Sequence, residues 1–412
     1  MAANYPEPPG GHWRVLVTGL NLAPVERWVS ILLDAGAEVL HLGITPVKYH
    51  SRPTGSQDRY RFERYAGLAR FSREDLLTSF EVVKQALPGE CDHIHRLASE
   101  FKPQVYHAFG IDYGAHALGA AGVQPFVLSA MGYVNALVDP KYAALEVAER
   151  SRGLPKGALD TMKRASALLV GAPLFVERCR AILPPGIEIE FLKTGLDCQL
   201  FQPDAAARKQ SRQALGAPPE GTVALSARGW APNYNHHLVL EAFGRSLPHL
   251  PPPAFLVFLG LNRSNLVNIS IDYFEMVRSR VNEMGLQEHV RFLPAFPQVM
   301  MPAILNAADW VISVPERDAF PLTILEALAC EVPVIAGRLP VLEQTVYTPY
   351  LKLVDPHDTE AFAAALASEP LPVEARREAR RWVEAEHDSA VIARRTFDLY
   401  SRLLKTAERP GL

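Results

Sequence analysis

The chain has 412 residues, 48% of them hydrophobic and 21% charged, which is typical of a globular protein with more than one core. Its formal net charge of −3 gives no support for binding to a nucleic acid, which would need a basic stripe. No stretch reaches the roughly eighteen apolar residues that a membrane-spanning helix needs, so the composition favours a soluble two-domain protein.

The first half of the chain alternates apolar strands with helices, which is typical of a Rossmann-like domain. Strands are predicted at residues 13–19, 38–43, 105–110, 125–130, 168–171 and 189–192. Helices are predicted at 24–35, where Gly36 is a stop signal, and at 114–121. The charged segment 61–87 is predicted to form a pair of surface helices.

The alternation starts again after a break near residues 194–203, which indicates a second domain of the same kind. Strands are predicted at 223–227, 255–260, 290–293, 310–315 and 332–336, with helices at 237–246, 271–284, 300–308 and 322–330 between them. Apolar residues recur through 376–405, so the end of the chain is predicted to be helical. The expected fold class is α/β, with two parallel sheets.

The four cysteines, Cys91, Cys179, Cys198 and Cys330, lie far apart and form no CxxC pair. This spacing indicates neither a zinc site nor a disulfide framework. Residues 1–12 are rich in proline and glycine and have no apolar segment of the signal-peptide kind. We therefore expect a cytoplasmic protein.

One stretch of the second half carries the clearest chemical pattern. Asp318 follows the apolar run 310–315. Seven residues separate it from Glu326, which lies within the predicted helix 322–330. The strand 332–336 comes next. A carboxylate before a turn and another in the following helix are expected to lie at the carboxyl edge of a parallel sheet, where such sheets bind ligands.

This stretch resembles the nucleotide-sugar-dependent retaining glycosyltransferases of the GT-B type, in the large family four. Those enzymes have two glutamates with seven residues between them, in the context E-G-F-G-L-x-x-L-E-A-M-A-x-G-x-P-V-V-A. Here Asp318 and Glu326 form the pair, and the segments 320–322, 326–329 and 332–336 match as well. The segment 194–203 resembles the family's G-V-D-x-x-x-F-x-P segment, which precedes the second domain.

The resemblance implies two facing Rossmann-like domains with a cleft between them. Residues 1–197 would bind the acceptor, residues 198–385 would bind the donor, and residues 386–412 would form a helix that returns to the first domain. It also implies transfer with retention from a UDP- or GDP-sugar, without a metal or other cofactor. The acceptor stays open, and exposed apolar helix faces in the first domain are candidates for a peripheral membrane contact.

The resemblance assigns roles to residues around the acidic pair. Asp318 would hold the donor sugar and Glu326 the ribose, through charge-assisted hydrogen bonds. The backbone of Leu322 and Thr323, at a helix start, would contact the diphosphate. Phe320 is either a donor contact or a core residue. We also expect Gly229, Asn233 and Arg317 to line the donor site.

The family's basic pair is altered in this chain. Aligned from Glu241, Gly229 falls at the family's arginine and Tyr234 at its lysine, while Arg228 is one position away. Arg228 is our candidate for the phosphate contact, and Lys193, Arg263 and Arg317 are possible substitutes. Two histidines, His107 and His116, are candidates for a contact near the anomeric carbon, although a lone histidine is more often a satisfied core residue.

Several interpretations stay open from the sequence. The preferred one is an active retaining glycosyltransferase with an unusual donor or acceptor. A second is a degenerate GT-B protein that binds a sugar nucleotide, a glycan or a protein partner without transfer. A sugar-nucleotide epimerase or a glycosyl phosphorylase on the same fold is a third. A dinucleotide oxidoreductase is disfavoured because no G-x-G-x-x-G follows the first strand.

Overall fold

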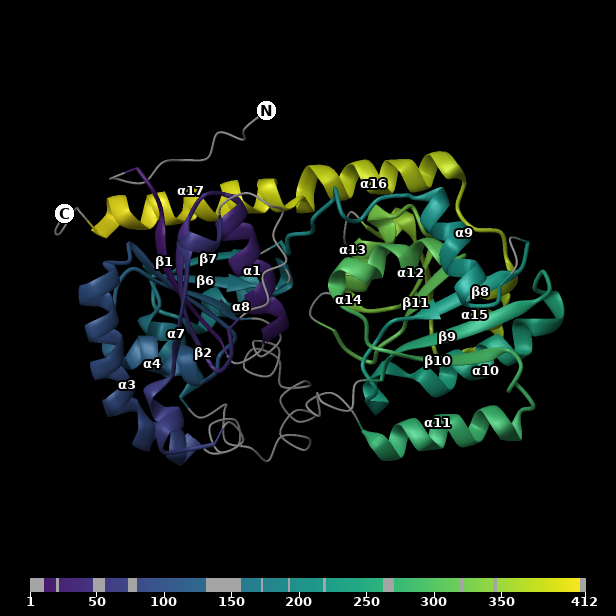
Figure 1. Ribbon diagram of the computed structural model, residues 1–412, viewed down its shortest axis with the longest axis horizontal. Helices are drawn as coiled ribbons and strands as arrows, with labels where there is room; N and C mark the ends of the chain where they lie inside the picture. Colours follow the sequence, from purple (N-terminus) through teal and green to yellow (C-terminus); the bar gives the residue numbers. More distant parts are fainter. Residues whose placement is uncertain are drawn as a thin grey trace. The chain divides into compact units, whose positions relative to one another are not determined.

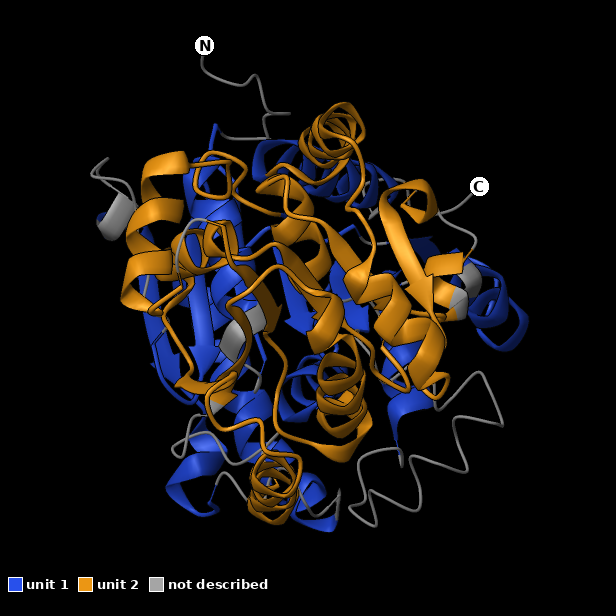
Figure 2. Cartoon of the chain, turned by 90° about the vertical axis from the view of Figure 1, so that its right-hand side faces the viewer, with its two compact units in different colours: residues 1–195, 389–412 blue, residues 196–388 orange. Residues whose placement is uncertain are grey.

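The computed structural model describes residues 11–19, 22–46, 56–72, 80–130, 157–171, 173–191, 193–217, 220–261, 270–318, 322–343 and 347–407. The chain forms two compact units, coloured separately in Figure 2. Unit 1 comprises residues 1–195 and 389–412, and unit 2 comprises residues 196–388. Within the described ranges, no helix is both long enough and apolar enough to cross a membrane.

Unit 1 is built on a seven-stranded sheet in the order β3-β2-β1-β4-β5-β6-β7, with every neighbouring pair parallel. The strands are β1 (Arg14–Thr18), β2 (Glu38–Gly43), β3 (Tyr60–Arg64), β4 (Val105–Phe109), β5 (Phe126–Ala130), β6 (Ala167–Val170) and β7 (Glu188–Phe191). The helices labelled in Figure 1 are α1 (Leu22–Asp34), α3 (Phe80–Phe101), α4 (Tyr113–Ala121), α7 (Ala158–Arg164), α8 (Pro173–Ile182) and α17 (Ser389–Ala407). Short 3-10 turns lie at Ser56–Arg59 and Ala66–Ala69.

The end of the chain packs on the same sheet as its beginning. One apolar core combines Val15 and Val17 of β1 with Trp28 of α1 and with Phe397 and Tyr400 of α17, all of them buried. The ring of Phe397 stacks on Trp13, with 5.4 Å between the ring centroids. Burial of these aromatic side chains is a large apolar contribution, so α17 is an integral part of unit 1.

The prediction of a helix pair over residues 61–87 was wrong in its first part. Residues Tyr60–Arg64 form β3, the edge strand that pairs in parallel with β2. Tyr60 and Phe62 lie against His41 of β2, while Arg61 and Arg64 are exposed. The short, charged strand depends on this long-range pairing, which a local helical pattern does not reveal.

Unit 2 repeats the architecture with a six-stranded parallel sheet in the order β10-β9-β8-β11-β12-β13. The strands are β8 (Thr222–Ser226), β9 (Ala254–Leu261), β10 (Val290–Pro294), β11 (Trp310–Ser313), β12 (Val334–Gly337) and β13 (Leu351–Val354). The helices are α9 (Ala205–Ala214), α10 (His236–Ser246), α11 (Ile271–Glu283), α12 (Met301–Ala307), α13 (Leu322–Ala329), α14 (Pro340–Glu343), α15 (Thr359–Ala367) and α16 (Val373–His387). The 3-10 turns are Pro232–Tyr234, Leu247–His249, Gln298–Met300 and Thr348–Tyr350. The α/β class with two parallel sheets is confirmed.

Alternate residues of β8 enter different cores of unit 2. Val223 and Leu225 contribute to a core that also contains residues of α12, α13 and α16. Ala224 contributes to a second core with residues of α10, α11 and α15. Because successive side chains of a strand point to opposite faces, these are the two covered faces of one sheet. Burial on both faces explains why its central strands are continuously apolar.

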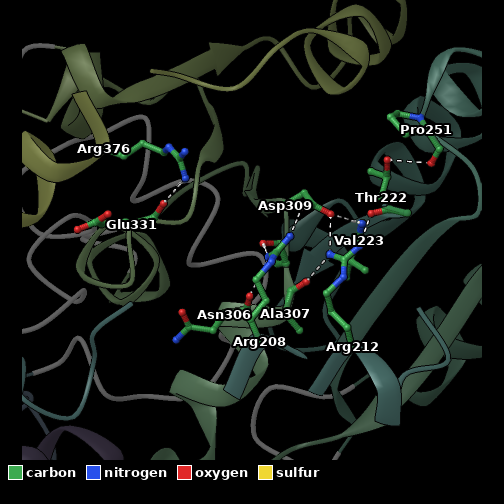
Figure 3. Close-up of polar contacts among 12 residues, drawn as sticks. Arg208, Arg212, Thr222, Val223, Pro251, Asn306, Ala307, Asp309, Glu331 and Arg376 are labelled. Atoms are coloured by element: carbon green, nitrogen blue, oxygen red, sulfur yellow. Dashed lines mark hydrogen bonds and ion pairs between the residues drawn. The ribbon is translucent and has the colours of Figure 1, made fainter. Parts of the chain in front are cut away.

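Two arginines of α9 hold the amino edge of this sheet (Figure 3). Arg208 pairs with Asp309 at 2.5 Å and also donates to the carbonyl oxygens of Asn306 and Ala308. Arg212, with a side chain only 3% exposed, pairs with Asp309 at 2.9 Å and donates to the carbonyls of Ala307 and Gly221. The backbone N–H of Val223 donates to Asp309 as well. These bonds fasten the starts of β8 and β11 to each other.

Candidate functional site

The candidate site lies at the opposite, carboxyl edge of the same two strands. In the order of the sheet, β8 and β11 are neighbours, and the chain continues outward from them in opposite directions. In open parallel sheets, the usual ligand site lies at such a reversal, outside the carboxyl ends of the two strands. The loop after β8 carries Arg228, and the loop after β11 carries Asp318.

Arg228 and Asp318 form an ion pair through the arginine Nη2 and the aspartate Oδ2. Their side chains are 12% and 15% exposed, so the pair is mostly shielded from water. The guanidinium lies over the ring of Tyr234, with 4.7 Å between its central carbon and the ring centroid. Among the residues that the structure describes, the buried Nε of Arg228 has no hydrogen-bond acceptor. The site therefore holds a fixed cation with an N–H group still available.

A glycine allows the Arg228 loop to approach β9 closely. Gly260 has a φ of +97°, a backbone conformation that residues other than glycine rarely adopt. A Cβ at this position would lie 2.9 Å from the carbonyl oxygen of Arg228. The backbone of Arg228 is therefore packed directly against β9.

A buried neutral histidine fixes the next residue of this loop. His236, fully buried, lies with its Nε2 at 3.0 Å from the carbonyl oxygen of Gly229 and its Nδ1 at 3.3 Å from the hydroxyl of Ser226. Burial, with a smaller contribution from the charge of Arg228, lowers the pKa of His236 to about 4. At neutral pH the ring is therefore uncharged, and its Nε2–H donates to Gly229.

Three residues predicted for the site follow β11: Arg317 and Asp318, which the structure describes, and Phe320. Glu316, just before the predicted Arg317, donates its backbone N–H to the carbonyl of Asn233 at 2.8 Å, which joins the two loops. Arg317 is half-buried. Phe320 lies outside the described residues. The structure thus brings Arg228, Asn233 and Asp318 together at one edge of the sheet.

Helix α13 supplies the other predicted donor residues. It begins at Leu322, and Thr323 and Glu326 are buried, with 8% and 7% exposed. The Thr323 hydroxyl lies 3.5 Å from the carbonyl oxygen of Ala227, next to Arg228. The negative charge of Glu326 adds to burial in raising the pKa of Cys330. The first N–H groups of such a helix have no intrahelical acceptor and suit an anion.

The two candidate histidines lie in the interior of unit 1. His107 of β4 is fully buried, with its ring nitrogens 2.6 Å from the Tyr400 hydroxyl and 2.7 Å from the Ser129 hydroxyl. Burial lowers its pKa to about 3. His116 of α4 lies with its Nδ1 2.7 Å from Thr161 Oγ1, and burial lowers its pKa to about 4. The contacts of His107 fit the alternative of a satisfied core histidine, and the catalytic assignment of both residues stays a prediction.

Residues beyond those predicted also shape the site: Tyr234, Asn235, His236, Gly260 and Glu316. Tyr234 was visible in the sequence as the residue at the family's lysine position, but its contact with Arg228 was not. Asn235, Gly260 and Glu316 act through contacts with distant segments, and His236 through contacts within its own loop; one sequence gives no signal for either. Across the described ranges, no three His, Cys, Asp or Glu side chains lie close enough together to hold a metal ion.

Residues 207–381 match the model of the family described as glycosyl transferases group 1. This range contains Arg228, Asp318 and Glu326. A D-inositol 3-phosphate glycosyltransferase of Saccharomonospora viridis is 32% identical over 219 residues, covering 51% of this chain and 48% of the relative. A GDP-mannose-dependent alpha-(1-6)-phosphatidylinositol monomannoside mannosyltransferase of Mycolicibacterium smegmatis is 27% identical over 212 residues, covering 49% of this chain and 52% of the relative. The chain thus matches about half the length of these curated relatives.

Solved structures extend the likeness of fold to nearly the whole chain. Sucrose-phosphate synthase from Thermosynechococcus elongatus superposes with a TM-score of 0.74 at 17% identity, covering 96% of this chain and all of that one. Anabaena HepE, in complex with UDP and glucose, superposes with a TM-score of 0.71 at 15% identity, covering 95% and 100%. The fold is that of the GT-B glycosyltransferases.

Proposed function

Because residues 207–381 of this chain match the family model of the glycosyl transferases of group 1, we propose that the protein transfers a sugar from a nucleotide-diphosphate sugar to an acceptor hydroxyl. Transfer proceeds with retention of the anomeric configuration and without a metal ion. The observation that carries the proposal is the Arg228–Asp318 pair at the reversal point of the sheet, beside the start of α13.

In this proposal Arg228 neutralises the departing diphosphate. The reaction builds negative charge on the phosphate oxygens, and a fixed cation aimed at that charge lowers the barrier. The unsatisfied Nε–H of Arg228 suits a phosphate oxygen. The amides of Leu322 and Thr323 add two donors from the start of α13. Tyr234 keeps the guanidinium in place where the related enzymes have a second cation.

The two carboxylates hold the hydroxyl groups of the donor. Asp318 binds the sugar, sharing its carboxylate between Arg228 and a hydroxyl group, and Glu326 binds the ribose. Glu326 is mostly buried, which strengthens a hydrogen bond to its carboxylate. The names of the relatives support a nucleoside-diphosphate donor: one is GDP-mannose-dependent, and HepE was solved with UDP and glucose. We therefore propose UDP- or GDP-sugar as donor.

The proposed chemistry takes place on one face of the sugar. The bond from the anomeric carbon to the diphosphate oxygen breaks, and its electron pair goes to the diphosphate. The acceptor oxygen bonds to the same face, and its proton passes to the leaving phosphate oxygen. Arg228 and the α13 amides stabilise the charge at that oxygen throughout.

All four cysteines are unpaired, which supports the proposed cytoplasmic location.

The test is incubation of the purified chain with UDP- and GDP-sugars and a panel of acceptors, measuring release of the nucleoside diphosphate. We expect release from at least one donor in a metal-free buffer containing a chelator, and a product with the donor's anomeric configuration by NMR. An inverted product would refute retention, and a requirement for added metal would refute metal independence.

One observation favours binding without transfer as a second candidate. Asp318 is engaged by Arg228, and the lysine that accompanies arginine in related enzymes is replaced by Tyr234. Thermal stabilisation by a nucleotide sugar, with no nucleotide release in the presence of any acceptor of the panel, would support this candidate over the transferase.

A further inference from the structure

Glu316 connects three loops at the carboxyl edge of the unit 2 sheet. Its backbone N–H donates to the carbonyl of Asn233, in the loop after β8. Its Oε1 accepts a hydrogen bond of 2.9 Å from Asn235 Nδ2 and lies 3.1 Å from Nε2 of His357, in the loop after β13. Glu316 itself is two residues from Asp318. The loops that carry the two charged groups of the site are thus tied together beside them.

Asn235 is held in a conformation that serves this connection. Its φ is +55°, in the left-handed region, and it is only 2% exposed. It precedes α10, yet its side chain makes no capping bond to that helix, which is the usual role of asparagine there. The two N–H groups of its amide go instead to the carbonyl of Val314, at 2.9 Å, and to Glu316. Both amide protons are used across the loop boundary.

The connection lies directly next to the groups that it would control. Asn235 follows Tyr234, whose ring supports the guanidinium of Arg228. Val314 and Glu316 precede Asp318 on the other loop. A shift between the loops would therefore change the distance between Arg228 and Asp318. Displacements of about 1 Å in positioning groups can cost about a hundredfold in rate.

We propose that Asn235 and Glu316 are positioning residues that fix the Arg228 loop against the Asp318 loop, and so set the geometry in which a nucleoside diphosphate is bound. This inference rests on the proposed function of the site. Neither residue touches the ligand; both act through Arg228 and Asp318. His357 is 64% exposed, so its bond to Glu316 contributes little.

The test compares glycine substitutions at two positions whose backbone is in the left-handed conformation. Asn235→Gly keeps the left-handed backbone accessible and removes only the two side-chain bonds. Glu331→Gly is the matched control, because Glu331 has a φ of +56° in the same unit and lies after α13. Binding of UDP and of GDP to the intact chain is measured by calorimetry, together with Tm.

We expect Asn235→Gly to weaken the binding of the nucleoside diphosphate about tenfold, as the loss of one charge-assisted and one neutral hydrogen bond allows. Glu331→Gly should bind like the wild type. Glu316→Ala should reproduce the loss, and Glu316→Gln, which keeps an acceptor for Asn235, should restore most of the affinity. In an Arg228→Met background, Asn235→Gly should have no further effect, which a merely structural role would not produce.

Wild-type affinity in both Asn235→Gly and Glu316→Ala would overturn the inference and leave the proposed function standing. An undiminished effect of Asn235→Gly in the Arg228→Met background would also overturn it. If the wild-type chain binds neither UDP nor GDP, the proposed function fails and this inference fails with it.

Discussion

Arginine–aspartate pairs lie at both edges of the unit 2 sheet, beside β8 and β11, but the arginines differ in their surroundings. At the amino edge, Arg208 and Arg212 donate to Asp309 and to four carbonyl oxygens of the nearby backbone (Figure 3). At the carboxyl edge, Arg228 donates to Asp318 alone among the described residues, and its Nε–H is left over.

Under the proposed function, this difference separates a structural ion pair from one that serves a ligand. A buried arginine whose donors end on backbone carbonyls holds two strand ends together and has little capacity for a ligand. A buried arginine with an unsatisfied donor is costly for the fold, and this cost is recovered when an anion binds. Under the proposed function, the same pair of residue types fastens one edge of the sheet and binds a ligand at the other.

The largest effect on stability is expected at the amino edge. Arg212→Met leaves Gly221 and Ala307 without their donor and removes one cation from Asp309. Breaking a buried pair of this kind should lower the free energy of unfolding by about 3 kcal/mol. Urea denaturation measures it, with the exposed Arg278→Met as control. An unchanged midpoint would contradict a structural role for this edge.

At the carboxyl edge the loss should appear in activity instead. Arg228→Met should reduce the rate of nucleotide release about a hundredfold, because one preorganised donor to the leaving group is lost. The free energy of unfolding should fall less than in Arg212→Met, because the substitution also removes a buried N–H group that has no acceptor. Arg228→Lys should recover part of the rate. Loss of stability without loss of activity would reverse the two roles.

Acid should weaken the carboxyl edge through His236. Its pKa is about 4 in the folded chain against an ordinary 6.5, so the unfolded chain takes up a proton first as the pH falls. The stability contributed by the neutral ring is complete above pH 6.5 and is lost progressively down to about pH 4. At pH 5 this one group should cost about 2 kcal/mol.

His236→Gln keeps an N–H donor for the Gly229 carbonyl but removes the titrating ring. The free energy of unfolding should therefore depend less steeply on pH, by the contribution of one proton. Urea denaturation between pH 7 and pH 5 measures the slope, with the exposed His357→Gln as control. Buried His41, His107 and His116, whose pKa values burial lowers to about 4, 3 and 4, should keep unit 1 sensitive to acid in both variants. Identical slopes in the wild type and His236→Gln would refute the assignment.

The smallest effect is expected from the backbone that supports Arg228. Gly260→Ala places a Cβ 2.9 Å from the Arg228 carbonyl at a φ of +97°, so the loop must shift. We expect a loss of about 1 kcal/mol in stability and a several-fold weaker binding of UDP or GDP. Gly285→Ala is the control, because its φ is +67° and no atom lies within 4 Å. Equal nucleotide affinities in both variants would show that Arg228 does not depend on this contact.

The sequence revealed those parts of the fold that depend on local pattern. Apolar runs and their spacing identified the strands on both sides of α13, and the resemblance carried by Asp318 and Glu326 led to the GT-B fold, which the structural comparisons confirm. The edge strand β3 was mistaken for helix because its pairing with β2 is a long-range contact.

The same limit applies to the site. The sequence indicated Arg228 as a candidate cation, since it lies one position from the family's arginine in the alignment. It did not indicate that Arg228 pairs with Asp318 or lies on Tyr234, since 90 residues separate the two charges. Nor did it indicate the bonds from Asn235 to Glu316, because the choice between helix capping and a bond to another loop depends on what the fold places beside the asparagine.

We propose that the arginine at the carboxyl edge binds a nucleoside diphosphate and that those at the amino edge do not. Calorimetric titration of the intact chain with UDP and GDP tests it in three proteins: the wild type, Arg208→Met and Arg228→Met. We expect equal affinity in the first two proteins and affinity about a hundredfold weaker in Arg228→Met. Unchanged binding in Arg228→Met, or no binding by the wild type, would contradict it.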